Sequence, residues 1–491
     1  RTKSLWLGLS ALLAFAASTA SAQRVLQDTV CSWSLTEGCH SEVLCSYQLK
    51  FGDFTPSQAC CARPEMLDIP QLLHLAYAGS PSDSTGMTIS WATYQKASDS
   101  AVWIGLAESS LEIVDKTLAP SASYYSDDDY SLFQNHATMR GLKPHTKYFY
   151  KVGSARDLKL QSPLNTFTMA RPAFDTSAVI IAVHGGAGDG DNAADTIKYV
   201  DSLGDKIDFV YHVGDISYTD DGFLVPLYAL GFFYEDVWDQ WINEMTPIMS
   251  KVPYMVVVGN HEAECHSPNC QISKTKKDKL DNYTAYNARF KMPSKESGGV
   301  LNMWHSFDHG RIHFTADYSG APKNELPLTH SNGNFGDQLV WLEADLKKAA
   351  ANRGNIPEAD KDGVPTGDSK IAQEAFEELF IKYGVDVVVT SHYHFYERHL
   401  PIARGKAIMD GVSADKKTYA NPKAPVYLTA GAAGNIEDHG KMPKARTSWS
   451  AASDYKIFGI SMLTATREAL EWTFVASKTE KELDRFKITK R

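Results

Sequence analysis

Three short polar stretches, each after an apolar run, constrain this chain more than any other feature. The run at 209–213 precedes Gly-Asp-Ile-Ser-Tyr (214–218), the run at 255–258 precedes Gly-Asn-His-Glu (259–262), and the run at 385–389 precedes Ser-His-Tyr-His (391–394). The length and β-branched content of these runs predict buried strands. Parallel strands deliver their carboxyl ends to one edge of a sheet, where open α/β folds bind ligands. The sequence therefore predicts an α/β domain with a metal site where three such edges converge.

Composition bounds the size and the partners of the chain. Its 491 residues, 43% of them hydrophobic, can bury a large core and divide into two or more domains. A formal net charge of −10 gives no basic surface for a polyanion, so we expect no nucleic-acid partner.

The N-terminus has the pattern of a secretory signal peptide. Basic residues precede an apolar run at 5–17, and Ala20-Ser21-Ala22 has the small-x-small form of a cleavage site. We expect a signal peptide at 1–22, a secreted, extracellular protein and no membrane attachment after cleavage. The alternative, a transmembrane anchor, needs about 20 apolar residues, and hydroxyl residues interrupt this run.

The seven cysteines fit an oxidising compartment. Five of them lie in a cysteine-rich segment at 23–65, whereas Cys265 and Cys270 flank a loop just after Gly-Asn-His-Glu. We expect a Cys265–Cys270 disulfide that stiffens the rim of the site. The alternative, thiolate metal ligands, suits softer metals than an oxygen-rich site would hold. Asn282 begins a glycosylation sequon.

The pattern changes along the chain from all-β to α/β. Residues 87–91 and 148–152 alternate with period two, which predicts an all-β sandwich over 66–171. From 172 to 491, apolar runs alternate with helix-like segments, which predicts the catalytic α/β domain. Helices are expected at 338–351 and 370–382, and a closing β-hairpin at 459–465 and 470–476.

The aspartate and the tyrosine of the first stretch suit a cation of high charge. Asp215 offers a hard anionic ligand that can bridge two cations, and Tyr218 can bind one of them as phenolate. A phenolate forms near neutral pH only when a strongly Lewis-acidic metal such as ferric iron lowers the pKa of the tyrosine. Taken alone, each residue has a plainer interpretation, with Asp215 as a cap or turn residue and Tyr218 as a packing residue.

The other two stretches add neutral ligands. Asn260 offers a carbonyl ligand after a glycine that allows a sharp turn, and His261 can orient phosphate or donate a proton. His392 and His394 share a face in extended backbone and can bind two neighbouring metals. The plainer interpretation of Asn260 and His261 is an ordinary turn, and that of His392 and His394 is a pair of surface histidines. Together the three edges favour the metal site.

With these residues in place, the chain resembles the purple acid phosphatases of the secreted, two-domain kind, within the calcineurin-like metallophosphoesterases. The resemblance runs from about 70 to 487. Besides the three stretches it includes, in chain order, His-Leu-Ala-Tyr (74–77), Gly-Leu-Lys-Pro (141–144), Asn-Met-Trp-His-Ser-Phe-Asp (302–308), Gln-Leu-Val-Trp-Leu-Glu (338–343), His-Phe-Tyr-Glu-Arg (394–398) and Pro-Val-Tyr-Leu-Thr (425–429) leading to Gly434-Asn435.

The resemblance implies a fibronectin-III-like front domain and a catalytic αββα sandwich with ferric iron beside divalent iron, zinc or manganese. It implies that Asp215 bridges the metals, that Tyr218 and His394 bind the ferric ion, and that Asn260 and His392 bind the divalent one. His261 would be the catalytic residue that contacts the phosphoryl group.

The implied activity is acid phosphatase. A metal-bound hydroxide would attack the phosphorus of a small-molecule phosphate monoester. The alternatives are a non-catalytic relative or a phosphodiesterase of the same superfamily, and a homodimer is left open as the oligomeric form.

The chain departs from the family pattern at two places. Gly186 stands where the family has an aspartate ligand after the first catalytic strand (178–183), and His184 and Asp189 lie close enough in sequence to compensate. Between Ser331 and Ser391 there is no histidine, and 351–369 is polar, so a central strand and a ligand histidine are missing. Either the deletion is real and the site degenerate, or a coding stretch is absent from the sequence.

Overall fold

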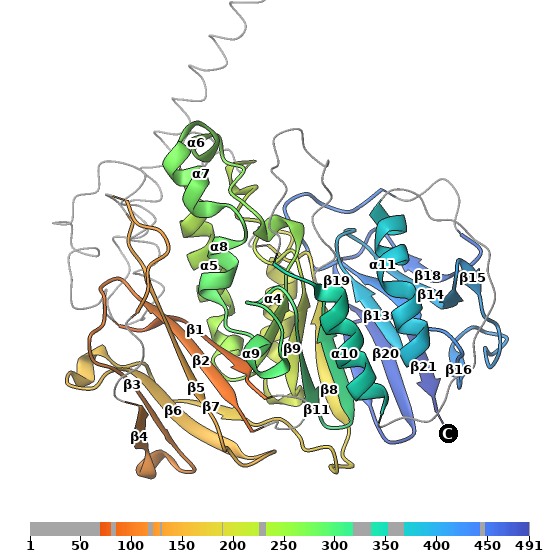
Figure 1. Cartoon of the computed structure of the whole chain (residues 1–491), viewed down its shortest axis with the longest axis horizontal. Coiled ribbons are helices and arrows are strands. Elements are labelled where there is room, and N and C mark those ends of the chain that lie inside the picture. Colours follow the sequence, from red (N-terminus) through yellow and green to blue (C-terminus); the bar gives the residue numbers. More distant parts are fainter. Residues whose placement is uncertain are drawn as a thin grey trace, which may run out of the picture.

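The structure is a computed structural model that describes most of the chain after residue 68 (Figure 1). The described residues are 69–79, 85–115, 121–127, 130–188, 190–224, 232–317, 335–351, 368–441 and 447–490. The predicted signal peptide at 1–22, the cysteine-rich segment at 23–65 and Asp189 lie outside them.

The front part of the described chain consists of two antiparallel sheets, drawn in orange to yellow in Figure 1. One sheet has the order β1 (Gln71–Tyr77), β2 (Met87–Thr93), β5 (Phe133–Met139), and the other has the order β4 (Glu112–Asp115), β3 (Ser100–Gly105), β6 (Lys147–Ser154), β7 (Asn165–Thr168). The alternating segments at 87–91 and 148–152 lie in β2 and β6, so the all-β front domain is confirmed. Its likeness to fibronectin III stays a prediction.

The first catalytic sheet carries two of the three predicted edges. Its order is β10 (Tyr254–Val257), β9 (Phe209–Val213), β8 (Val179–His184), β19 (Gly459–Ala465), β20 (Ala469–Ala476), β21 (Glu482–Thr489), β16 (Thr418–Ala420). β8, β9 and β10 are parallel neighbours, so their carboxyl ends share one edge of the sheet. β19 and β20 form the predicted hairpin, which pairs with β8.

The third edge comes from a second sheet. This sheet has the order β13 (Val387–Thr390), β17 (Val426–Ala430), β14 (Tyr396–Ala403), β15 (Lys406–Ala407), with β18 (Ser450–Asp454) also on β14. The prediction of a buried strand at 385–389 is wrong: the three valines of β13 are only half-buried, and Thr390 is exposed. The reason is that, within the described chain, β13 pairs on one side only, with β17.

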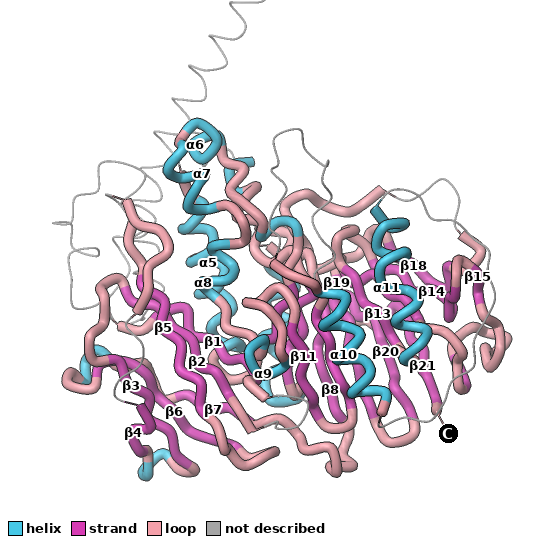
Figure 2. The backbone as a smooth tube through the Cα atoms, in the orientation of Figure 1, coloured by secondary structure: helices cyan, strands magenta, loops and turns pink. Residues whose placement is uncertain are grey.

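Helices flank the sheets. They are α4 (Ala194–Leu203), α5 (Tyr234–Met249), α6 (Pro268–Ile272), α7 (Lys274–Leu280), α8 (Thr284–Arg289), α9 (Ser294–Ser297), α10 (Gln338–Ala350) and α11 (Asp368–Tyr383), with a small hairpin of β11 (His305–His309) and β12 (Ile312–Ala316). α10 and α11 confirm the predicted helices and lie side by side (Figure 2), joined by Lys382 and Tyr383, which both contact Glu343. The polar residues 352–367 between them lie outside the described chain.

A buried ion cluster joins the front domain to the catalytic domain. Arg289 at the end of α8 is 0% exposed, and its guanidinium donates at 2.7 Å to both Glu235 and Asp239 of α5. Tyr124 and Tyr130 of the front domain complete the cluster, since the Arg289 Nε donates to the Tyr124 hydroxyl at 2.8 Å. A buried charge is tolerated only when it is paired in this way.

We expect Arg289→Met to destabilise the protein by about 3–5 kcal/mol, because it leaves two buried carboxylates without their cation. The free energy of unfolding from urea titrations would measure this. Arg485→Met is the matched control: its surface ion pairs with Glu471 and Glu482 contribute at most ~1 kcal/mol. Equal losses in the two variants would contradict a structural role for the buried cluster.

Candidate metal centre

A single carboxylate fixes the turn that carries Asp215. The Glu262 side chain accepts hydrogen bonds from the backbone N–H groups of Gly259 and Ile216, both at 2.7 Å, and of Asp215 at 3.1 Å. Asp215 has the left-handed φ of 53°, which aspartate tolerates better than most residues. Glu262 thus holds the turn after β9 against the turn after β10.

The two turns are so close that only glycine fits at position 259. A Cβ there would lie 2.2 Å from both the backbone N and the Oδ1 of Asp215. His261, in the same turn, also contacts this aspartate, since its backbone N–H donates to Asp215 Oδ1 at 3.4 Å. From the sequence, this glycine was predicted only to permit a sharp turn. Its packing against Asp215 becomes visible in the structure.

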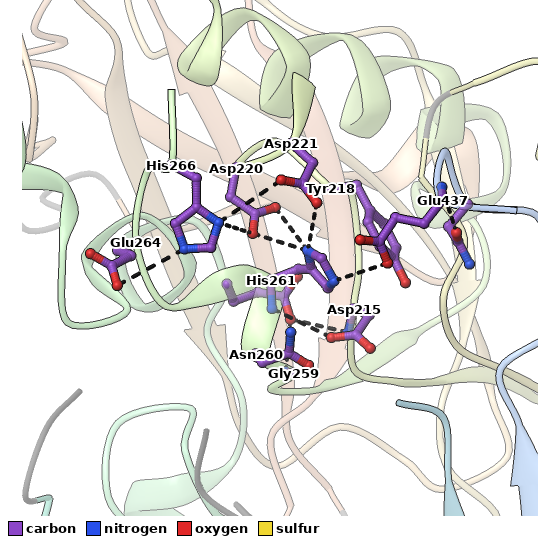
Figure 3. Close-up of polar contacts among 12 residues, drawn as sticks. Asp215, Tyr218, Asp220, Asp221, Gly259, Asn260, His261, Glu264, His266 and Glu437 are labelled. Carbon is purple, nitrogen blue, oxygen red and sulfur yellow. Dashed lines mark hydrogen bonds and ion pairs between the residues drawn. The ribbon is translucent and has the colours of Figure 1, made fainter. Parts of the chain in front are cut away.

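The predicted ligands meet in two pairs. The Tyr218 hydroxyl lies 2.9 Å from His394 Nε2, and Asn260 Oδ1 lies 2.8 Å from His392 Nδ1. Figure 3 shows Asp215, Tyr218, Asn260 and His261 gathered at this place. These are the two pairs that the resemblance assigns to one cation each. In the first pair Tyr218 is buried, at 2% exposure, and His394 is partly buried, whereas His392 in the second pair is exposed.

The third stretch reaches the site because the two catalytic sheets meet at their carboxyl ends. The Ser391 hydroxyl donates to the carbonyl oxygen of Val213, at the end of β9. The Gly185 N–H, after β8, donates to the Ala430 carbonyl oxygen at 2.9 Å, at the end of β17. Both contacts join one sheet to the other directly beneath the paired ligands.

His261 has a carboxylate partner that the sequence did not reveal. Its Nδ1 lies 2.9 Å from Asp220 Oδ2, and Asp220 also lies 3.2 Å from His266 Nδ1 (Figure 3). Burial lowers the pKa of His261, but the Asp220 carboxylate outweighs it and raises the pKa well above the usual range. The only sequence signal was that Asp220 follows Tyr218 by two residues.

The environment of the Tyr218 and His394 pair sets the protonation state of each side chain. Burial lowers the pKa of His394 to about 4, so its imidazole is neutral, and its Nε2 lies 2.9 Å from the Tyr218 hydroxyl. Burial, together with Asp215 and Glu437, raises the pKa of Tyr218 well above its usual value. The phenol therefore stays protonated unless a strongly Lewis-acidic cation binds it.

Gly186 faces this pair. A Cβ on Gly186 would lie 3.4 Å from the Tyr218 hydroxyl, so a side chain there would point toward the phenol. The glycine has φ +64° and the Cβ position is 2.9 Å from the Gly431 carbonyl oxygen, which makes any substitution strained. Residue 186 therefore provides no ligand beside Tyr218.

His184, predicted as a compensating ligand, lies elsewhere. It is 1% exposed, its ring centroid is 4.4 Å from that of His212, and its Nε2 is 3.3 Å from the Tyr254 hydroxyl. The reason is its place on β8: its side chain enters the core behind the Asp215 turn, and burial lowers its pKa to about 4. The structure does not bring His184 to Tyr218 or His394.

One carboxylate at the centre was missed from the sequence. Glu437, in the loop after β17, has its Oε2 3.6 Å from His394 Nε2 and 3.7 Å from His261 Nε2. The ligand atoms of Asp221, His261 and Glu437 all lie within 4.8 Å of one another. The signal in the sequence is that Glu437 closely follows Gly434-Asn435, a motif of the resemblance.

The rim of the site agrees with two further expectations. Cys265 and Cys270 form the predicted disulfide, which closes the loop between the Asn260 turn and α6. Asn282 is exposed in the turn between α7 and α8, where a glycan would have access to solvent. Glycosylation itself stays a prediction.

Comparisons with known proteins agree with this geometry. Three family models match in chain order: "Purple acid Phosphatase, N-terminal domain" over 70–169, "Calcineurin-like phosphoesterase" over 181–396, and "Iron/zinc purple acid phosphatase-like protein C" over 424–485. An acid phosphatase of Aspergillus ficuum is 28% identical over 457 residues, covering 70% of this chain and 74% of that protein. Purple acid phosphatase 23 of Arabidopsis thaliana is 28% identical, covering 75% of this chain and 80% of that protein.

A solved structure shows the same fold. The purple acid phosphatase PPD1 from yellow lupin (Lupinus luteus) seeds superposes with a TM-score of 0.64 at 20% identity, covering 86% of this chain and 74% of that one. The chain belongs to the purple acid phosphatase family of calcineurin-like phosphoesterases.

Proposed function

We propose that the protein is a metal-dependent acid phosphatase that hydrolyses small-molecule phosphate monoesters at a site for ferric iron and a divalent iron, zinc or manganese. The observation that carries this proposal is the pairing of Tyr218 with His394 and of Asn260 with His392 beside Asp215. The acid phosphatase activity named for its relatives supports the same reaction.

The donor set fits the proposed cations. A phenol, an imidazole and the Asp215 carboxylate suit a hard, highly charged ion, and an amide oxygen with an imidazole suits a borderline divalent ion. When bound, two such cations supply a nucleophile from water and neutralise charge on the phosphoryl oxygens. Asp215 is the anionic residue that the resemblance places between them.

His261 supplies a fixed positive charge. Asp220 holds its Nδ1 and raises its pKa, so the ring is an imidazolium whose Nε2–H can donate to a phosphoryl oxygen. Because Asp220 is 0% exposed and His261 only 7% exposed, the ring cannot turn freely toward solvent. We propose that His261 binds and orients the phosphoryl group of the substrate.

We also propose that the protein acts outside the cell, as the pattern at 1–22 predicts. The Cys265–Cys270 disulfide supports an oxidising compartment. Among the described residues, no helix is long and apolar enough to cross a bilayer. A homodimer stays an open prediction.

The glycine at 186 favours a second candidate, a relative that keeps the fold and binds phosphate esters without turnover. One experiment separates the two. The protein is loaded with iron and zinc, its metal content and visible spectrum are recorded, and hydrolysis of an aryl phosphate monoester is compared with that of a diaryl diester. Two metals per chain, a tyrosinate-to-iron band and faster monoester hydrolysis support the enzyme; colourless, inactive protein contradicts it.

Asp215→Asn is expected to lower kcat by more than ~10³-fold, because it removes the shared anionic ligand, and metal-ion catalysis contributes several kcal/mol. Asparagine also tolerates the left-handed backbone at this position, so the fold should survive. Initial rates with an aryl phosphate measure the effect. Asp205→Asn, an exposed carboxylate remote from the site, is the control and should retain full activity.

Gly259→Ala is expected to lower both stability and activity, because the new Cβ would overlap Asp215 and separate the two turns. Overpacking of this kind destabilises by about 1–3 kcal/mol. Thermal unfolding and the same rate assay would measure the two effects. Gly190→Ala is the matched control, since nothing lies within 4 Å of its Cβ position. If Gly259→Ala kept full activity, the close contact between the turns would not matter for function.

A further inference from the structure

The pair of Tyr218 and His394 lacks a carboxylate at the position that Gly186 occupies. Tyr218 and His394 supply only one potential negative charge between them, and Asp215 is shared with the second pair. A trivalent cation needs more anionic ligands than this to compensate for the loss of its hydration shell. Since His184 lies in the core, another residue must supply the charge if the site is to hold ferric iron.

We propose that Glu437 is this ligand: its carboxylate completes the Tyr218 and His394 pair and takes the place that a residue at 186 leaves open. The inference rests on the proposed function, because it concerns the same cation.

The distances place His394 close enough to each of the other two side chains to share a cation with it. A cation about 2.1 Å from each of two ligand atoms requires those atoms to lie no more than about 4.2 Å apart. His394 Nε2 meets this limit with both neighbours, at 2.9 Å from the Tyr218 hydroxyl and 3.6 Å from Glu437 Oε2. Figure 3 shows the Glu437 carboxylate directed toward His261 and the neighbouring phenol. Its side chain is 39% exposed, so it has freedom to adjust.

The loop that carries Glu437 is anchored to Gly186 itself. Asn435 is 0% exposed; its Nδ2 donates to the Gly186 carbonyl oxygen at 3.4 Å, and its Oδ1 accepts from the Glu437 N–H at 2.9 Å. The Cβ position of Gly186 also lies 3.4 Å from Asn435 Nδ2. The residue that lacks a carboxylate is therefore fixed beside the loop that offers one.

The charges around Glu437 also favour a cation. Its carboxylate lies within 4.8 Å of the ligand atoms of Asp221 and His261. Two carboxylates this close repel each other at low dielectric unless a positive charge lies between them. His261 supplies one positive charge, but Asp220 already engages it at 2.9 Å. The alternative is that Glu437 only forms an ion pair with His261, at 3.7 Å. The experiment must distinguish this ion pair from a role of Glu437 as a metal ligand.

The test compares iron binding by the full chain and by Glu437→Gln, each loaded with ferric iron and zinc. We expect the variant to lose more than about 100-fold in ferric affinity, measured by competition with a chelator, because loss of an outer-shell partner alone lowers metal affinity about 10–100-fold. The tyrosinate-to-iron band should disappear with the iron. Asp438→Asn is the matched control on the same loop: it removes an exposed carboxylate, keeps a side chain that tolerates φ of 67°, and should bind iron as the unmodified chain does.

The outcomes separate this inference from the proposed function. If the unmodified chain binds iron but hydrolyses no ester, the proposed function fails and the comparison of iron affinities still tests Glu437. If Glu437→Gln retains the iron affinity and the band, Glu437 is only a partner of His261 and the inference is overturned. An unmodified chain that binds no iron overturns it as well. Thermal unfolding of Glu437→Gln and of the shortened Glu437→Asp verifies that lost binding does not reflect an unfolded protein.

Discussion

The centre depends on one buried carboxylate. Glu262 is 1% exposed and satisfies three backbone N–H groups from two separate turns. Without it these donors would be buried and unpaired, at about 1–3 kcal/mol each. It also fixes the left-handed backbone at Asp215, which carries ligand atoms. The fold thus keeps this ligand in a strained position by fixing the backbone of the two turns.

The two ligand pairs differ in how firmly the fold holds them. Tyr218 and His394 lie at the junction of the two sheets, where Ser391 and Gly185 join the strand ends. His392 is exposed and follows β13, whose half-buried valines show that one side of this strand lacks cover from the described residues. Packing fixes ligand geometry, and geometry sets metal affinity. A cation bound at Asn260 and His392 is therefore expected to exchange more readily than one bound at Tyr218 and His394.

The sequence predicted what depends on local pattern. The run at 209–213 became β9 with the same bounds, because apolar, β-branched residues determine a buried strand almost by themselves. Asp220 and Glu437 were missed because each acts through a neighbour that only tertiary structure supplies, His261 for one and His394 for the other. His184 looked suitable by sequence distance, yet the alternation of side chains along β8 directs it into the core. The burial of β13 was predicted wrongly for the same reason: a run of valines does not reveal whether a neighbouring strand covers it.

The topology would allow a ligand to come from a different strand end while the site keeps its place. β8, β9 and β10 end at one edge, and β13 and β17 end against it from the second sheet, so five loops reach the same small volume. Any of these loops can present a carboxylate there without altering a strand. A substitution at the end of β8 can therefore be compensated from the loop after β17, which residue-by-residue comparison with a family motif does not detect. The strand ends as a group supply the ligands of such a centre. Which strand supplies a given ligand matters less.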